Sequence, residues 1–220
     1  ALTALGAEIP NTSGYFRPVS MKMPAGSFIN ANPPAPVAAR SMGCIRLFQS
    51  IMGAFAQMLP QAIPACSGGC EYGSGISGYD KSKTPWKPWI QMDFANETAI
   101  GAFAYKDGTD AQGCYNTNLA NIPVEEIEAE QPLLVEEYAL VADTEGAGMY
   151  RGGLGMSRKY RYLLDETLVQ MRADREEHTP YGLFGGEDSA PTEIHAQYGK
   201  EVKTMPTKFL ATFNAGDALL

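Results

Sequence analysis

The chain has 220 residues, of which 45% are hydrophobic and 19% charged, a composition that excludes a disordered protein. Its formal net charge of −8 and the lack of a lysine- and arginine-rich run argue against nucleic-acid binding. No stretch has the roughly 20 apolar residues that span a bilayer, and no signal-like segment opens the chain, so we expect a soluble cytoplasmic protein.

Residues 9–38 are rich in residues that form turns. The prolines at positions 33, 34 and 36 forbid a helix and disfavour a central strand, so we expect an extended segment that lies over a surface. Asn11, Asn30 and Asn32 suit hydrogen bonds to the backbone in turns, and contact with a ligand is the alternative for each of them.

Residues 39–59 have the pattern of a helix. Apolar side chains recur at steps of three and four from Cys44 to Leu59, and Pro60 marks the end. Further apolar positions predict that this helix is buried on more than one side. The glycine, serine and cysteine residues of 60–84 predict a loop, which lacks the glycine and lysine spacing of phosphate-binding loops.

From residue 86 onward, most of the chain has the composition and alternation of strands. Strands are predicted over 89–94, 102–105, 133–142, 156–163, 167–173, 193–198 and 207–213. Lys106 to Gly108 suits a hairpin turn, and the acidic residues 124–130 suit one or two helical turns. These elements predict an α+β fold, in which strand-rich mixed sheets pack against one long buried helix.

The segment from Asp143 to Gly155 contains five glycines and one arginine between two predicted strands. This is more glycine than a two-residue hairpin turn requires. Because glycine permits positive φ and close approach of the backbone, a tightly folded loop would explain the pattern. The alternative is a backbone cradle from which Arg151 reaches into a site.

The chain is poor in the residues that most often catalyse reactions. Its cysteines and histidines are Cys44, Cys66, Cys70, Cys114, His178 and His195. Cys66 and Cys70 have no further ligands nearby in the sequence, so we expect free thiols rather than a zinc site. We expect His178 in a loop and His195 in an edge strand, both structural, since no Ser-His-Asp order or nucleophile elbow is present.

Charged residues beside the glycine-rich segments are the remaining candidates for chemistry. They are Asp107, Glu125, Glu126, Asp143, Arg151, Arg172, Asp174 and Arg175. A network of salt bridges among them would be structural only. The functional alternative is a polar pocket in which an arginine binds a carboxylate, carbonate or phosphate through two hydrogen bonds.

Short phrases in a fixed order cover nearly the whole chain. They include Asn11-x-x-Gly-Tyr-Phe-Arg-Pro18, Asn32-Pro-Pro-Ala-Pro-Val-Ala-Ala-Arg40, Lys106-Asp-Gly-Thr-Asp110, Asn121-Ile-Pro-Val-Glu125, Gly146-Ala-Gly-Met-Tyr-Arg-Gly-Gly-Leu-Gly155, Asp174-Arg175, Gly182-Leu-Phe-Gly-Gly186 and Gly216-Asp217. In this order they resemble the hydantoinase B/oxoprolinase family. The substrate-binding candidates that we take from these phrases and loops are Arg40, Asp107, Asn118, Glu125, Arg151 and Arg175.

The resemblance implies a B-type subunit that works in a hetero-oligomer with a hydantoinase A-type partner. In the family, that partner binds ATP and activates the substrate, and hydantoins, 5-oxoproline or related lactams are then opened by hydrolysis. Where relatives have a divalent metal, its ligands lie in the first half of the subunit. We therefore expect residues 1–220 to be a C-terminal portion, truncated at both ends, and assign it no metal ligand or cofactor.

Two other functions remain open on the sequence alone. Family relatives include carboxylases of acetone and acetophenone, which use ATP and bicarbonate, so the chain would then belong to a ketone carboxylase. A purely structural part that buries a subunit interface is the third hypothesis. The chain also departs from the common family pattern, because Glu145 and the segment 188–191 occupy positions where a further glycine is usual.

Overall fold

The computed structural model describes residues 12–38, 40–69, 72–93, 99–113 and 120–220. Within these ranges the fold is α+β, as predicted, with two α-helices and nine strands in two antiparallel sheets. The helices are α1 (Arg40–Met58) and α2 (Val124–Glu130). Neither helix in this part of the chain has the length and apolar character that crossing a bilayer requires.

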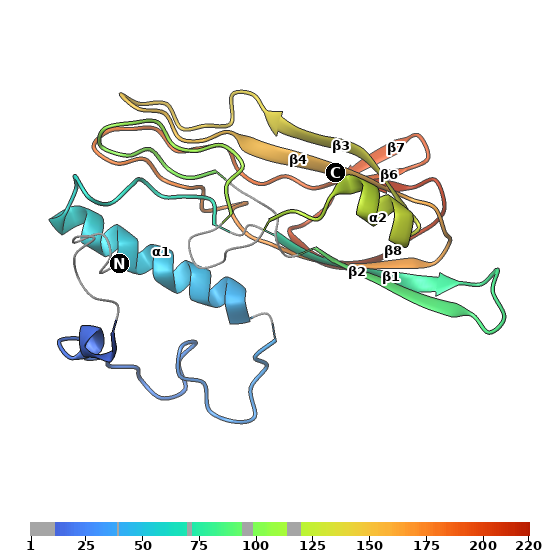
Figure 1. Ribbon diagram of the computed structural model, residues 1–220, viewed down its shortest axis with the longest axis horizontal. Coiled ribbons are helices and arrows are strands. Elements are labelled where there is room, and N and C mark those ends of the chain that lie inside the picture. Colours follow the sequence, from blue (N-terminus) through green and yellow to red (C-terminus); the bar gives the residue numbers. More distant parts are fainter. Residues whose placement is uncertain (1–11, 39, 70–71, 94–98, 114–119) are drawn as a thin grey trace.

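The two sheets form two layers that face each other (Figure 1). The first sheet has the order β2-β1-β5-β8, with the bounds β1 Tyr72–Asp80, β2 Lys87–Asp93, β5 Thr167–Ala173 and β8 Lys208–Phe213. The second sheet has the order β3-β4-β9-β6-β7, with the bounds β3 Leu133–Val141, β4 Gly155–Tyr162, β6 His195–Tyr198, β7 Glu201–Thr204 and β9 Ala218–Leu219.

The hydrophobic core lies between the sheets. Alternate residues of β5 are buried, as the sequence pattern predicts, because side chains of a strand point to opposite faces in turn. Tyr162 and Phe213 are fully buried, and their ring centroids are 4.8 Å apart. Tyr198 stacks on Phe213 at 5.2 Å, so aromatic contacts join the two layers in the core.

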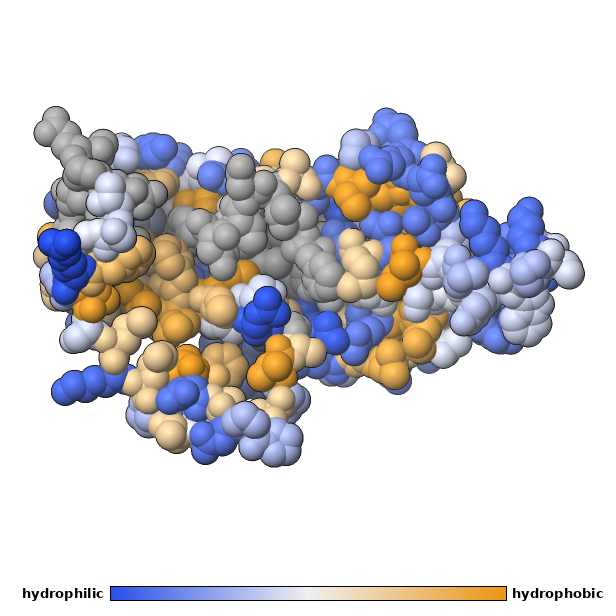
Figure 2. Space-filling view, turned by 60° about the horizontal axis from the view of Figure 1, so that its bottom comes forward, coloured by the Kyte–Doolittle hydropathy of each residue, from blue (hydrophilic) through white to orange (hydrophobic). Residues whose placement is uncertain are grey.

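The predicted helix at 39–59 is present as α1, but its burial on more than one side is not confirmed. Of its residues, only Ile45, Gln49 and Ala56 are buried. Leu47, Ile51 and Met58 are exposed, since one face of the helix contacts loops while the opposite face has no cover in the described part of the chain. Figure 2 shows orange and pale orange atoms gathered at the end of the molecule that carries this helix.

Three predictions about where strands lie are wrong. The glycine-rich segment at 72–80 is strand β1 and not a loop, with Gly78 facing the indole of Trp89 on β2. Residues 102–105 form no strand, because their backbone joins neighbouring loops instead. His195 lies in β6, which is paired on both sides by β9 and β7, so it is not on an edge strand.

Three extended loops continue beyond one end of the sheets and run side by side (Figure 1). We call residues 99–113, 142–154 and 180–193 the loop layer. Its backbone hydrogen bonds join Gly108 N to Arg151 O, Gly153 N to Ile100 O, Glu187 N to Ala147 O and Ala190 N to Thr144 O, at 2.8–3.0 Å. Polar backbone groups are thus paired between loops, which gives this region a defined shape without regular strands.

Candidate functional site

A cavity of about 810 Å³ lies where the loop layer meets the ends of the sheets. Its walls come from all three loops, from residues 60–68 and from inward-facing residues of β1, β4 and β5. Glycines and apolar side chains make up most of the lining. This size and character are typical of sites that bind small molecules.

Close backbone contacts within and between the loops explain several glycines in and beside the cavity wall. A Cβ at Gly146 or Gly153 would lie 2.2 Å from a carbonyl oxygen of a neighbouring loop, and a Cβ at Gly108 or Gly182 would lie 2.0–2.3 Å from a carbonyl oxygen of its own loop. None of the five glycines in 143–155 has a positive φ, whereas Asp143 does, at 60°. The glycines of this segment therefore allow close approach of the backbone, and they do not serve left-handed turns.

Arg151 is held by the loop layer itself. Its Nη1 donates to Asp110 Oδ1 at 3.2 Å and to the carbonyl oxygen of Gly152 at 3.0 Å. Its backbone N–H donates to Asp107 Oδ1 at 3.0 Å. The structure thus brings together two predicted site residues, Arg151 and Asp107, but their contacts fasten one loop to another, and neither lines the cavity.

Asp110, which the sequence analysis did not single out, is the centre of this fastening. The backbone N–H of Leu154 donates to its Oδ1 at 2.7 Å, in addition to the bond from Arg151. The hydrogen bond from Leu154 lowers the pKa of Asp110, and the Arg151 side chain adds to this effect, while burial opposes it. Its place in the phrase Lys106–Asp110 was the available signal.

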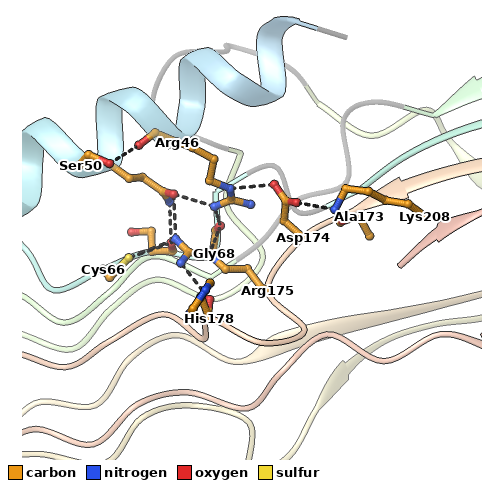
Figure 3. Close-up of polar contacts among 11 residues, drawn as sticks. Arg46, Ser50, Cys66, Gly68, Ala173, Asp174, Arg175, His178 and Lys208 are labelled. Carbon is orange, nitrogen blue, oxygen red and sulfur yellow. Dashed lines mark hydrogen bonds and ion pairs between the residues drawn. The ribbon is translucent and has the colours of Figure 1, made fainter. Parts of the chain in front are cut away.

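Arg175 organises a second group of polar contacts, beside α1 (Figure 3). We call Arg46, Gln49, Cys66, Gly68, Asp174 and Arg175 the arginine cluster. Arg175 donates from Nη2 to Gln49 Oε1 at 2.7 Å and to Cys66 Sγ at 3.2 Å, and from Nε to Gly68 O at 3.3 Å. Its φ is 71°, so the chain turns sharply as it leaves β5 and directs this side chain toward the helix.

Arg46 of α1 donates to two of the acceptors that Arg175 also uses, Gly68 O and Gln49 Oε1. It donates from Nη1 to Gly68 O at 2.7 Å and to Gln49 Oε1 at 2.6 Å, and from Nε to Asp174 Oδ2 at 3.0 Å. Lys208 of β8 also binds Asp174, at 2.9 Å. Burial alone would raise the pKa of Asp174, but the hydrogen bonds from Lys208 and Arg46 outweigh burial and lower it.

The arginine cluster has an excess of positive charge. Arg46 and Lys208 share the single carboxylate of Asp174. Arg175 donates only to neutral acceptors among the residues that the structure describes, namely the oxygens of Gln49, Ser67, Gly68 and His178 and the sulfur of Cys66. Among the described residues, the fold therefore positions this charge without a carboxylate partner.

The arginine cluster forms part of the cavity wall. Cys66 and Gly68 line the cavity and also accept hydrogen bonds from Arg175. Tyr181, another lining residue, is close by, since its carbonyl oxygen accepts a hydrogen bond from Cys66 N at 3.1 Å. Burial raises the pKa of its hydroxyl, and Cys66 adds to that effect while Arg175 opposes it.

A buried ion pair closes the inner end of the cavity. Arg158 of β4 donates from Nη1 to Asp93 Oδ2 of β2 at 2.7 Å, and both side chains are at most 5% exposed. The Tyr160 hydroxyl donates to the same oxygen at 2.8 Å. Burial raises the pKa of Tyr160, and the charge of Asp93 adds to it. Sequence analysis missed this pair because it joins strands 65 residues apart.

The other candidates lie elsewhere or cannot be placed. Arg40 is exposed at the start of α1, Glu125 is exposed in the first turn of α2, and neither lines the cavity. Asn118 lies outside the described residues. Cys44 and Cys66 are free, as expected, while Cys70 and Cys114 are also outside the described part. Within that part, no three Cys, His, Asp or Glu side chains gather as metal ligands would.

Known proteins match the chain in sequence and in fold. The family model for hydantoinase B/oxoprolinase matches residues 1–220. The B-type subunit of a putative D-/L-hydantoinase from Pseudomonas sp. (strain NS671) is 30% identical over 203 residues, which cover 91% of this chain and 33% of the relative. The beta subunit of the caprolactamase from Pseudomonas jessenii is 32% identical over 151 residues, 66% of this chain and 26% of the relative.

Two solved structures share the fold. The ATP-dependent caprolactamase from Pseudomonas jessenii has a TM-score of 0.83 at 23% identity, over 99% of this chain and 39% of that one. An acetone carboxylase has a TM-score of 0.62 at 17% identity, over 79% of this chain and 27% of that one. The chain spans a third or less of the hydantoinase and caprolactamase subunits that it matches in sequence. On the match over its full length, the chain belongs to the hydantoinase B/oxoprolinase family.

Proposed function

We propose that this chain forms part of the B-type subunit of an ATP-dependent enzyme that hydrolyses a cyclic amide. Family membership supports the proposal, as do relatives named as hydantoinase, 5-oxoprolinase and caprolactamase. The observation that carries it is the cavity of about 810 Å³, with its glycine and apolar lining. Such walls suit a small, neutral ring better than a charged or extended ligand.

In this proposal the residues of the chain bind and orient the ring. The apolar walls exclude water from it, so that hydrogen bonds within the cavity are stronger than in solvent. Opening an amide places negative charge on the carbonyl oxygen in the transition state. Arg175 does not line the cavity but donates to the lining residues Cys66 and Gly68, and the field of its positive charge would stabilise that developing charge.

The activation step belongs to a second polypeptide. We propose a hydantoinase A-type partner that binds ATP and activates the substrate by phosphorylation, while a divalent metal, where one is used, is held outside this chain. Relatives named as one subunit of an enzyme support a hetero-oligomer. This chain then contributes the cavity, and its activity depends on the assembled complex.

The test is a turnover assay on the B-type subunit co-purified with its A-type partner. The neutral rings hydantoin and caprolactam, and 5-oxoproline, which carries a carboxylate, are each incubated with and without ATP, and the ring-opened product is measured by chromatography. We expect ring opening that requires both subunits and ATP. Incorporation of labelled bicarbonate into acetone or acetophenone, with no ring opening, would instead establish a ketone carboxylase.

A further inference from the structure

Ser74 has an unsatisfied hydroxyl at the inner end of the cavity. Ser74 is 1% exposed, and its Oγ has no hydrogen-bond partner in the described structure. It is also one of the residues that line the cavity. Buried hydroxyls in folded proteins are almost always hydrogen-bonded, so at a residue of the cavity lining a ligand group or a water would supply the partner of Ser74.

The strand pairing places Ser74 beside the buried ion pair. In the antiparallel pairing of β1 with β2, Ser74 is directly opposite Asp93. Residues that are directly opposite share one face of the sheet, here the face toward the second sheet. Asp93 binds Arg158 and Tyr160 of that second sheet, and both of these also line the cavity. Ser74, Arg158 and Tyr160 therefore form what we call the polar floor.

The polar floor is electrically balanced. The positive charge of Arg158 is offset by Asp93 at 2.7 Å. The apolar side chains of Ile76 and Met171 line the same part of the cavity. A carboxylate brought here would lose its hydration without gaining a free counter-charge, which is costly. A neutral group that accepts or donates a hydrogen bond would instead satisfy Ser74.

We propose that the polar floor binds the amide group of a neutral cyclic amide, with Ser74 Oγ as the hydrogen-bonding residue that selects for it. This inference rests on the proposed function, because it names the part of the cavity that recognises the substrate. The ring carbons would lie against the apolar and glycine walls. The arginine cluster, whose members Cys66 and Gly68 line the cavity, would then act on the charge of the transition state through its electrostatic field.

The test compares Ser74→Ala with Ser77→Ala in the complete complex. Ser77 is on the same strand but on its opposite face, so it is a matched control. The dissociation constants of hydantoin, 2-pyrrolidone and caprolactam are measured by calorimetry without ATP. We expect Ser74→Ala to weaken binding about 3- to 10-fold, the effect of one neutral hydrogen bond, and Ser77→Ala to leave it unchanged.

The thermal midpoint of the ligand-free complex separates this role from a structural one. Removing an unpartnered hydroxyl leaves the midpoint of Ser74→Ala unchanged or raises it. A lowered midpoint with unchanged affinity would show that a buried water satisfies Ser74, and would overturn the inference. If the wild type binds a cyclic amide and Ser74→Ala binds it equally well, only the polar floor fails. If the wild type binds none of the three amides, both proposals fail.

Discussion

Two regions of the molecule hold arginines in opposite ways. In the two packed sheets, which we call the double sheet, Arg158 is buried and bound to the carboxylate of Asp93, so that its charge is neutralised inside the core. In the arginine cluster, Arg175 is half-buried and bound to carbonyl and amide oxygens and a thiol. The first arrangement holds two sheets together, whereas the second holds a positive charge against Cys66 and Gly68 of the cavity lining.

The two arginine environments should respond differently to substitution, one in stability and the other in activity. A buried charge whose partner is removed is left without its counter-charge at low dielectric, which destabilises the fold strongly. A half-exposed guanidinium that donates to neutral acceptors can be lost at a lower cost in stability, because solvent screens what remains. Substitutions in the double sheet should therefore change folding most, and those in the arginine cluster should change activity most.

The largest expected effect is on the double sheet. Arg158→Met removes the guanidinium that neutralises the buried carboxylate of Asp93, and we expect the free energy of unfolding to fall by about 3–5 kcal/mol. Denaturant titration measures it. Lys159→Met is the control, since Lys159 pairs with Glu136 nearer the surface and should cost at most about 1 kcal/mol. Equal losses for the two variants would contradict the comparison.

The next largest effect on stability is expected at the glycines of the loop layer that line the cavity. In Gly153→Ala the new Cβ would lie 2.2 Å from the carbonyl oxygen of Thr109, so we expect a loss of about 1–3 kcal/mol from overpacking. In Gly152→Ala the nearest atom is at 3.5 Å, and stability should change little. Thermal unfolding of both variants measures the difference. Similar midpoints would show that the loops can move apart, and that backbone contact does not define the cavity.

A smaller effect on stability is expected for Arg175→Met, together with a larger effect on turnover. The lost hydrogen bonds should cost about 1–2 kcal/mol, while ATP-dependent turnover should fall at least about tenfold, since the positive charge behind Cys66 and Gly68 of the wall is gone. Arg151→Met is the matched control, because that arginine is also outside the lining but pairs with a carboxylate, that of Asp110. Near-normal turnover of an intact Arg175→Met complex would favour a purely structural role.

The smallest effect is a pH dependence of the arginine cluster. Because the pKa of Asp174 is lowered in the folded protein, its contribution to stability is present above the unfolded-state pKa of about 3.9. That contribution is lost as the pH falls below this value. Asp174→Asn should therefore lower the thermal midpoint at pH 6 by more than at pH 3. Exposed Glu177→Gln is the control, and an equal effect of Asp174→Asn at both pH values would contradict the expectation.

Local patterns predicted the strands that alternate. The interval 167–173 is confirmed at both ends as β5, because its period of two reflects one face in the core. Strand β1 was missed, since its glycines and serines suit a loop by composition and its burial depends on partners far along the chain. The outward face of α1 was misjudged for a related reason, because an apolar pattern does not say what covers it.

The site was predicted less completely than the fold. Family phrases pointed to Asp174, Arg175 and the segment 106–110, which do take part in the polar contacts near the cavity. They did not indicate Arg46 or Ser74, whose roles arise from contacts between segments that are distant in sequence. The spacing of apolar residues along the chain indicates helices and strands, but it does not indicate which loops contact each other.

The close backbone contacts of the loop layer also bear on how this cavity could change its ligand in evolution. Side chains cannot be introduced at Gly108, Gly146, Gly153 or Gly182 without moving the backbone of the loop layer. Variation in ligand size would then fall to lining positions that already have a side chain and are open to solvent, such as Met149 and Phe184. A library that randomises these two positions would test whether the cavity can accept rings of other sizes while the backbone of the loop layer stays the same.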